Sequence, residues 1–215
     1  MRALAVIAAL AAGPAAAHPH IFIDTELEVI FDAAGQATHV RVTWIYDDFY
    51  SLLMIEDRGL DPDGDGQLTA QEHASLQGFD MAWDADFPGD TYVLAGGQAV
   101  ALGRPADWTA AYVDGRIVST HLRALDPAVA AGADPLVVQV YDPGFYSAYY
   151  ITGQPVLTGA PPGCAAQVFE PDRDAADAIL QAALDELAGT ADLEMAFPAV
   201  GAAYAEEARI TCAGG

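Results

Sequence analysis

The stretch HPHIFIDTELEVIF, from His18 to Phe31, alternates apolar and polar residues and is rich in β-branched side chains. That alternation is typical of a strand with one buried face. The residues on the apolar side are Ile21, Ile23, Leu27, Val29 and Phe31. A turn-forming segment at 32–36 and a second alternating run from His39 to Tyr46 follow. We therefore expect the two runs to pair as a hairpin.

Further short strand-like runs follow the first hairpin, separated by turns such as Gly96-Gly97 and Asp114-Gly115. These runs cover residues 91–94, 99–102, 108–113, 116–122, 136–141, 146–152 and 156–157. Their regular spacing favours a mainly antiparallel β sandwich or open barrel over βαβ units. Apolar residues take a helical spacing from Asp172 to Leu187, and a short helix is expected around 202–208. The predicted class is α+β with a C-terminal helix.

The segment DPDGDGQLTAQE, from Asp61 to Glu72, matches the spacing of an EF-hand calcium loop. Acidic side chains stand at loop positions one, three and five, and Gly66 takes position six, where the backbone must turn sharply. The predicted calcium ligands are Asp61, Asp63, Asp65, the Gln67 carbonyl and both carboxylate oxygens of Glu72, with Thr69 acting through water. The alternative is an ordinary acidic turn, since Asp and Gly are common turn formers.

Helical segments are predicted on both sides of this loop, at 49–57 with Asp47-Asp48 as its cap, and at 69–83. Together they form an EF-hand-like helix-loop-helix insertion at about 47–86. Glu56 and Asp57 stand where an EF-hand has apolar residues, and the loop occurs once, whereas calcium sensors use paired loops. We interpret the loop as a structural calcium clip.

The chain carries 31 acidic and 8 basic residues, with a formal net charge of -23. This charge argues against nucleic acid or an anionic membrane surface as a partner, because both would be repelled. Residues 1–17 combine Arg2, an apolar run and a small-residue cleavage site, which predicts a secretory signal peptide. The mature chain is then a single domain over 18–215, outside the cytoplasm and with no membrane insertion.

Cys164 and Cys212 are the two cysteines of the chain. In an oxidising compartment they predict one disulfide, which would stabilise the fold by about 4 kcal/mol in the chain-entropy model. A thiolate metal pair is the alternative.

Signal cleavage would place His18-Pro19-His20 at the new amino terminus. The free amine and two imidazoles on one side of a strand are suitable ligands for zinc, nickel or copper. His121 lies in a strand-like run and is the candidate for a third ligand. The alternatives are polar residues on a frayed terminus and a hydrogen-bonded structural histidine. No hydrolase triad, phosphate loop or Cys-His nucleophile is recognisable, so we expect a binding protein and no enzyme.

Two acidic-aromatic clusters, Asp47-Asp48-Phe49-Tyr50 and 141–146, follow strand-like runs. They either line one cleft or supply turn aspartates and core aromatics.

Several short motifs occur in an order that resembles the periplasmic family known as domain of unknown function 1007. These are HPHIFI at 18–23, WIYD at 44–47 with Tyr50-Ser51, the acidic loop, YDP at 141–143 and PGC at 162–164. The resemblance implies a periplasmic component of an ABC-type transport system, working beside an inner-membrane permease of the nickel/cobalt type. One relative is tied to zinc uptake.

The expected function is thus a periplasmic metal-binding accessory protein for zinc, nickel or cobalt transport, with calcium in the acidic loop. Two other hypotheses remain open. One is a calcium-stabilised interaction module without transition-metal binding. The other is a copper enzyme that uses the amino-terminal histidine and would need His121 nearby.

Overall fold

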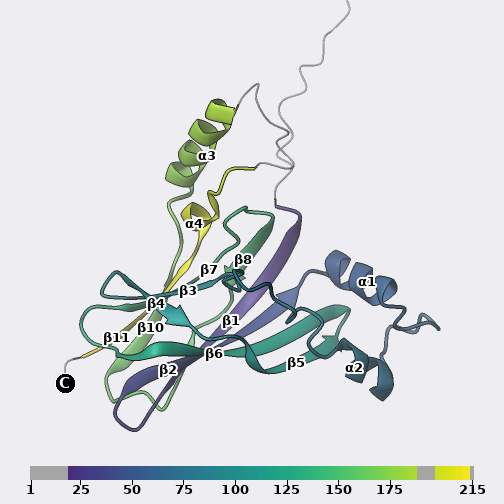
Figure 1. Ribbon diagram of the computed structural model, residues 1–215, viewed down its shortest axis with the longest axis horizontal. Coiled ribbons are helices and arrows are strands. Elements are labelled where there is room, and N and C mark those ends of the chain that lie inside the picture. Colours follow the sequence, from purple (N-terminus) through teal and green to yellow (C-terminus); the bar gives the residue numbers. More distant parts are fainter. Residues whose placement is uncertain (1–18, 188–196, 214–215) are drawn as a thin grey trace, which may run out of the picture.

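The computed structural model describes residues 19–187 and 197–213. Within them the chain forms a strongly curved sheet with short helices at two places on its surface (Figure 1). The strands are β1 (Ile21–Phe31), β2 (Gln36–Tyr46), β3 (Thr91–Ala95), β4 (Gln98–Leu102), β5 (Ala106–Val113), β6 (Arg116–Ala130), β7 (Leu136–Val140), β8 (Ser147–Ile151), β9 (Val156–Thr158), β10 (Cys164–Phe169) and β11 (Glu207–Cys212). The helices are α1 (Asp48–Asp57), α2 (Ala70–Leu76), α3 (Arg173–Leu187) and α4 (Gly201–Tyr204).

The sheet follows the path β10-β11-β7-β3-β4-β6-β2-β1-β8, with β5 joined to β6 and β9 joined to β1. This path forms a nearly closed, barrel-like sheet, so the open-barrel alternative describes it better than the sandwich. The predicted hairpin is confirmed, since β1 and β2 pair antiparallel from Ile23↔Tyr46 onward. The pairing is not antiparallel throughout, because β8 and β9 both run parallel to β1.

The inner face of the barrel follows from the alternation of β1, β2 and β6. Nearly every second residue of these strands is buried, in β6 as far as Leu125, and the registers place the buried positions beside one another. Most are aliphatic or aromatic, and their burial supplies most of the driving force for folding. Four are polar: Thr25, Ser119, His121 and Arg123. The barrel interior therefore contains polar groups that periodicity alone does not predict.

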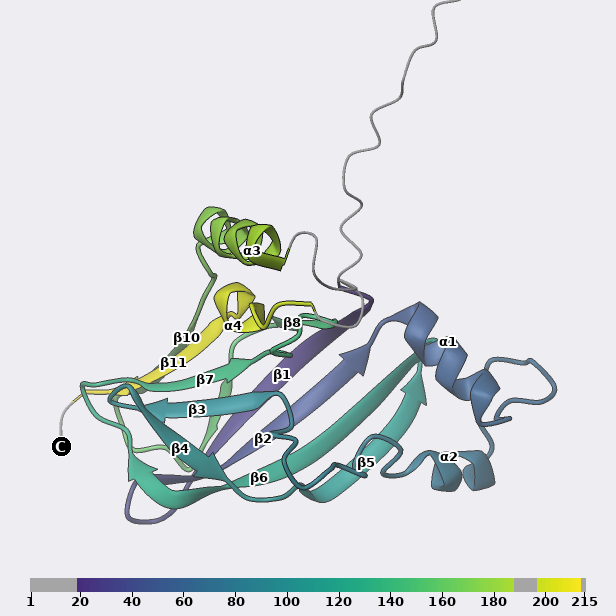
Figure 2. The same ribbon diagram turned by 45° about the horizontal axis from the view of Figure 1, so that its top comes forward.

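Helices α1 and α2 lie together at one end of the molecule, on either side of the acidic loop, as Figure 2 shows. Asp47 caps α1 as expected, and its side chain accepts from the Tyr50 amide. The predicted extent of α2 is wrong, because the helix ends at Leu76 and the chain turns at Gly78, whose φ is +67°. The released segment carries Trp83 onto the inner face of the barrel, where its ring is 6.3 Å from that of Trp44.

The C-terminal part differs most from the sequence-based expectation. Helix α3 is present, but of its predicted apolar face only Ala176 is fully buried, and Ile179 is 51% exposed. The tail is mainly strand, with the single turn of α4 leading into β11, which pairs with β10. The predicted disulfide is confirmed between Cys164 and Cys212, which face each other in that register.

Candidate metal-binding sites

The acidic loop brings three carboxylates together on the surface beyond α1. Asp61, Asp63 and Asp65 can each offer an oxygen so that all three oxygens lie within 4.8 Å of one another. Three like charges at this distance repel one another, and a divalent cation relieves the repulsion while accepting their oxygens as ligands. The cluster can therefore hold a metal ion, and hard carboxylate oxygens suit calcium.

The backbone of the acidic loop is folded around these carboxylates by local hydrogen bonds. Asp61 accepts from the amides of Asp65 and Gly66, both at 3.0 Å, and Asp65 accepts from the Gln67 amide at 2.8 Å. Gly64 and Gly66 take φ values of +68° and +77°, with open space where a side chain would lie. Glycine is favoured there for its backbone conformation alone. The carbonyl of Gln67 stays a predicted ligand.

Glu72 lies beside the carboxylate cluster and caps α2. Its Oε2 accepts from the Thr69 amide at 2.7 Å and its Oε1 from the Asp61 amide at 3.2 Å, while the Thr69 hydroxyl accepts from the Glu72 amide. These hydrogen bonds, led by that from Thr69, lower the pKa of the Glu72 carboxyl. Glu72 thus connects the two ends of the loop through hydrogen bonds. Binding an ion through both carboxylate oxygens, as predicted, would replace these hydrogen bonds.

The approach to the loop differs from that of an EF-hand, as the sequence predicts. Helix α1 ends at Asp57, and Arg58 and Gly59 close it with hydrogen bonds back to Met54 and Glu56. Leu60 is nearly buried and anchors the chain before position one, where Asp61 has a φ of +52°. The entering helix α1 therefore ends before the loop begins, and residues 58–60 connect it to Asp61, the first predicted ligand.

Of the amino-terminal histidines, His20 is described and His18 lies outside the described residues. His20 is exposed, and its ring centroid lies 4.6 Å from that of Tyr146. The two acidic-aromatic clusters flank the start of β1, because the Tyr146 carbonyl accepts from the His20 amide at 2.8 Å and the Asp47 amide donates to the Phe22 carbonyl at 2.9 Å. The Asp47 carboxylate is engaged in turn and cap bonds, accepting from the amides of Phe22 and Tyr50 at 2.8 Å.

His121 lies elsewhere, in the barrel interior on β6. The register pairs it with Val42, which pairs with Leu27 on β1. His20 precedes Leu27 by seven residues, or about 23 Å along the strand. The fold therefore does not bring His121 and His20 into one site, and the metal role of each stays a separate prediction.

The surroundings of His121 are aromatic and cationic. Its ring packs against Trp44 and Trp83, with centroids 4.6 and 5.3 Å apart. Neither ring nitrogen has a hydrogen-bond partner among the described residues. Burial, with a smaller contribution from Arg123, lowers the pKa of His121 to about 3. The imidazole is thus neutral at physiological pH.

Two aspartates near this region, the half-buried Asp80 and the buried Asp90, were missed by the sequence-based reasoning. Asp80 accepts from the Tyr46 hydroxyl at 2.9 Å, and Asp90 accepts from the Tyr149 hydroxyl at 2.8 Å. The other oxygen of Asp90 is buried without a partner among the described residues, whereas the Ser119 hydroxyl is close enough to Asp80 to lower its pKa. Burial raises both pKa values, that of Asp90 to about 7. The flanking glycines and dense aromatics of 78–90 are the signal that could have indicated a buried segment.

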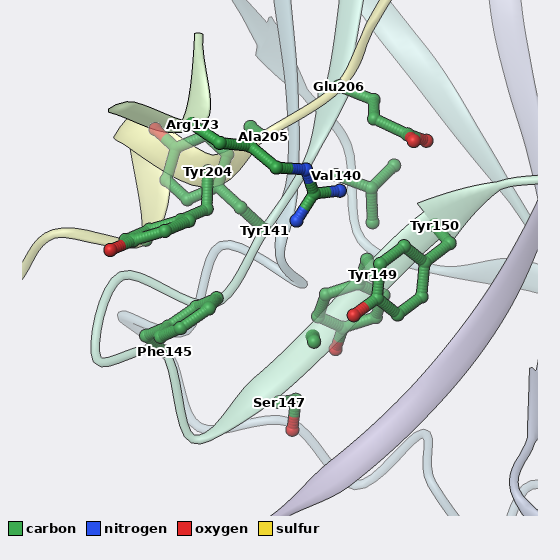
Figure 3. A pocket seen from close by; sticks show the side chains of 12 residues that line it. Val140, Tyr141, Phe145, Ser147, Tyr149, Tyr150, Arg173, Tyr204, Ala205 and Glu206 are labelled. Carbon is green, nitrogen blue, oxygen red and sulfur yellow. The ribbon is translucent and has the colours of Figure 1, made fainter. Parts of the chain in front are cut away.

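A small pocket lies between β8 and α4 (Figure 3). Its lining includes aromatic side chains together with Arg173 and Glu206, which reach it from the C-terminal part. Its volume is about 30 Å³. This is room for a water molecule or two but too little for an organic ligand.

The family model described as "Protein of unknown function (DUF1007)" matches residues 3–212. The chain belongs to this family. No curated protein matches it. Membership in the DUF1007 family confirms the resemblance seen in the sequence motifs, and the family description assigns no activity.

Two further findings bear on the compartment of this DUF1007 protein. Among the helices of residues 19–187 and 197–213, none is long and apolar enough to cross a membrane. The Cys164–Cys212 disulfide is consistent with an oxidising, extracytoplasmic compartment.

Proposed function

We propose that this DUF1007 protein is a periplasmic metal-binding accessory protein of a zinc, nickel or cobalt transport system, stabilised by calcium in the acidic loop. The observation that carries the metal-binding part is the convergence of Asp61, Asp63 and Asp65 within 4.8 Å. The transport role and the nickel/cobalt-type permease as partner rest on the family resemblance. A signal peptide over residues 1–17 and a binding role without catalysis belong to the same proposal.

Calcium acts here as a clip and not as a switch. The loop is anchored by Leu60 before it and by the capped α2 after it. A cation at Asp61, Asp63 and Asp65 ties these two anchors together, which stabilises the folded state by mass action. We find no second loop of this kind in the sequence that would build a sensor pair.

The calcium clip is tested by thermal unfolding of the mature chain in a chelator and in calcium or magnesium. Saturation at a hundredfold excess over Kd stabilises a one-site protein by about 2.7 kcal/mol. Glu72→Gln and Asp63→Asn should lose this gain, whereas Asp86→Asn, an exposed acid outside the loop, should retain it. If calcium does not change the unfolding temperature of the wild type, the loop is not a calcium clip.

The transition-metal part is tested by calorimetric titration of the mature chain with zinc, nickel, cobalt and copper ions. We expect a site that weakens strongly in His18→Ala/His20→Ala and persists in Glu72→Gln. His39→Ala serves as the matched control, since His39 is a half-buried histidine on β2. Unchanged binding in the double variant would remove the amino-terminal site, and loss of binding in Glu72→Gln would show that the two sites are coupled.

Two alternatives make different predictions for the same titrations. The calcium-stabilised interaction module binds calcium and no transition metal. The copper enzyme needs a third nitrogen ligand, and the separation of about 23 Å along β1 between His20 and the row of His121 disfavours His121 in that role. The accessory protein is therefore the proposal to test first.

A further inference from the structure

Arg123 is a buried cation without a described anionic partner. It lies on the inner face of β6 and is 3% exposed. Its Nε donates to the Gly103 carbonyl at 2.6 Å and its Nη1 to the Pro88 carbonyl at 3.0 Å. Among the described residues it makes no ion pair, and its Nη2 makes no hydrogen bond. A buried guanidinium is costly unless an anion and further acceptors compensate it.

A second arginine, Arg104, is exposed to solvent and lies near the same Trp83 ring as Arg123. Arg104 donates to the carbonyls of Asp84 and Trp83, and the guanidinium groups of Arg104 and Arg123 lie 5.8 and 4.8 Å from the Trp83 ring. Burial and the charge of Arg104 lower the pKa of Arg123 to about 10, so it stays charged at neutral pH. The two cations thus stand together without a carboxylate from the described residues.

Arg123 shares its lack of an ion pair with Arg58, Arg104 and Arg173 among the described arginines, and it differs from these three in being buried. The chain has 31 acidic residues for 8 basic ones, so carboxylates are abundant. Arg41, Arg116 and Arg209 each pair with one, at 3.1, 2.8 and 2.6 Å. The most deeply buried of the described arginines therefore has no carboxylate partner among the described residues.

A pocket of about 320 Å³ opens against Arg123. Its walls come from the β3–β4 hairpin, which Figure 2 shows next to β6, and from the segment that leads out of β7. The apolar part of the lining includes Val93, Leu94, Val100 and Leu102. Tyr92 and Tyr141 also line it, with rings stacked at 4.1 Å. A pocket of this size, apolar with a few polar groups, is typical of a small-ligand site.

We propose that this arginine pocket binds a small monocarboxylate with an apolar body, whose carboxylate pairs with Nη2 of Arg123. The apolar lining accommodates the hydrocarbon part, and the guanidinium fixes the charged end by a charge-assisted hydrogen bond. A single free guanidinium nitrogen matches one carboxylate better than a phosphate dianion, which needs more donors. The net charge of -23 also opposes entry of a multiply charged anion. This site is independent of the proposed metal binding.

The probe is hexanoate, titrated calorimetrically into the mature chain in the presence of a chelator, with hexanamide as the uncharged control. Acetate and octanoate extend the series on either side. We expect hexanoate to bind at least about tenfold more tightly than hexanamide, the ratio that one charge-assisted hydrogen bond provides. Because Trp83 lies against both arginines, its fluorescence should change with the same midpoint.

Three variants assign the binding to this pocket. Arg123→Met removes the charge and keeps an apolar side chain, and we expect it to lose at least about tenfold in hexanoate affinity. Val100→Phe fills the pocket and retains the arginine, and it should weaken hexanoate and octanoate alike. Arg41→Met removes a paired surface arginine and should bind as the wild type does. Circular dichroism and thermal unfolding verify that each variant is folded.

The proposal is overturned if no carboxylate of the series binds at millimolar concentration, or if hexanamide binds as well as hexanoate. It is equally overturned if folded Val100→Phe binds hexanoate with wild-type affinity. Should Arg123→Met fail to fold, the Val100→Phe result and the hexanamide comparison decide the question.

Discussion

The acidic loop and the arginine pocket have opposite charge and opposite construction. The acidic loop is exposed, spans twelve consecutive residues and is held by hydrogen bonds between near neighbours in the sequence. The arginine pocket is partly enclosed and draws on β3, β4, β6 and the end of β7, which are far apart in the sequence. The first arrangement can be recognised from residue spacing, whereas the second exists only when the barrel closes.

The difference also appears in what each region requires of its glycines. Gly64 and Gly66 need a left-handed backbone but have open space around them. Gly89, beside the arginine pocket, has a φ of +74°, and an added Cβ would lie 2.4 Å from the Trp83 ring and 2.5 Å from Nη1 of Arg123. Local conformation constrains the loop, while tight packing further constrains the pocket wall.

The largest expected effect therefore comes from Gly89→Ala. Left-handed strain and overpacking together should lower the free energy of unfolding by about 3 kcal/mol. At Gly64 the added Cβ has open space, so only the left-handed backbone strain applies. Gly64→Ala should therefore lower the free energy of unfolding by about 1 kcal/mol. Urea unfolding of both variants measures the two values. Equal losses would mean that the contact between Trp83 and Arg123 adapts easily, and the contrast between the regions would fail.

Asp90→Asn is expected to have the next largest effect, and its sign depends on pH. The pKa of Asp90 is raised to about 7 in the folded protein, mainly by burial, above its ordinary value of 3.8. Between these two values the folded state binds more protons than the unfolded state, so stability from this group falls as pH rises from 4 to 7. At about 1.4 kcal/mol per pH unit, reduced close to the two pKa values, the wild type should lose about 3 kcal/mol over this range relative to Asp90→Asn.

The Asp90→Asn comparison has a built-in control. Repulsion among the many exposed carboxylates also lowers stability as pH rises, but it acts on both proteins alike. Asp86→Asn, in an exposed acid of the same segment, controls for the loss of one charge. Parallel pH profiles for the wild type and Asp90→Asn would contradict a buried, protonated Asp90.

His121→Phe should have a smaller effect, of opposite direction. Phenylalanine keeps the ring between Trp44 and Trp83 and removes two nitrogens that lack described partners. We expect a gain of about 1 kcal/mol at neutral pH. Because the pKa of His121 is lowered to about 3 from 6.5, the wild type also loses stability as pH falls from 6.5 to 3, and the variant should not. A clear destabilisation at neutral pH would indicate that buried water or a ligand binds the imidazole.

The smallest effect is expected at the other end of the comparison, in the calcium-free acidic loop. The pKa of Glu72 is lowered from 4.5 by the hydrogen bonds that cap α2, so its contribution is present above about pH 4.5 and is lost as pH falls through the folded pKa. Glu72→Gln in a chelator should flatten this slight acid dependence of unfolding and change little at neutral pH. A large neutral-pH loss would show that the cap, and not an ion, holds the loop.

Prediction from the sequence succeeded where the determining contacts are local. The hairpin of β1 and β2 follows from alternation, the Asp47 cap from its position before α1, and the turns at Gly64 and Gly66 from the loop spacing. The disulfide followed from an even pair of cysteines in a secreted chain. The predicted helix at 69–83 failed beyond Leu76, because its apolar spacing serves packing of the released segment onto the barrel.

Long-range contacts account for what the sequence did not reveal. Strand β11 pairs with β10 and β7, so its strand conformation depends on partners distant in the chain. The parallel partners of β1 depend in the same way on segments more than a hundred residues away. The glycines and aromatics of 78–90 indicate a buried segment at most, and neither the burial of Asp90 in particular nor the separation of His121 from His20 can be read from local spacing.

By itself, the sequence determined the strand periodicity, the acidic loop with its candidate ligands, the cysteine pair and the family. These properties depend on backbone preference and side-chain chemistry within a few residues, so no distant contact is needed to specify them. Only the tertiary structure decided which polar groups are buried and which cations are left without carboxylates. Closing the barrel removes water from the inner face of β6, and that desolvation turns Arg123 from one of 8 basic residues into the centre of a ligand pocket.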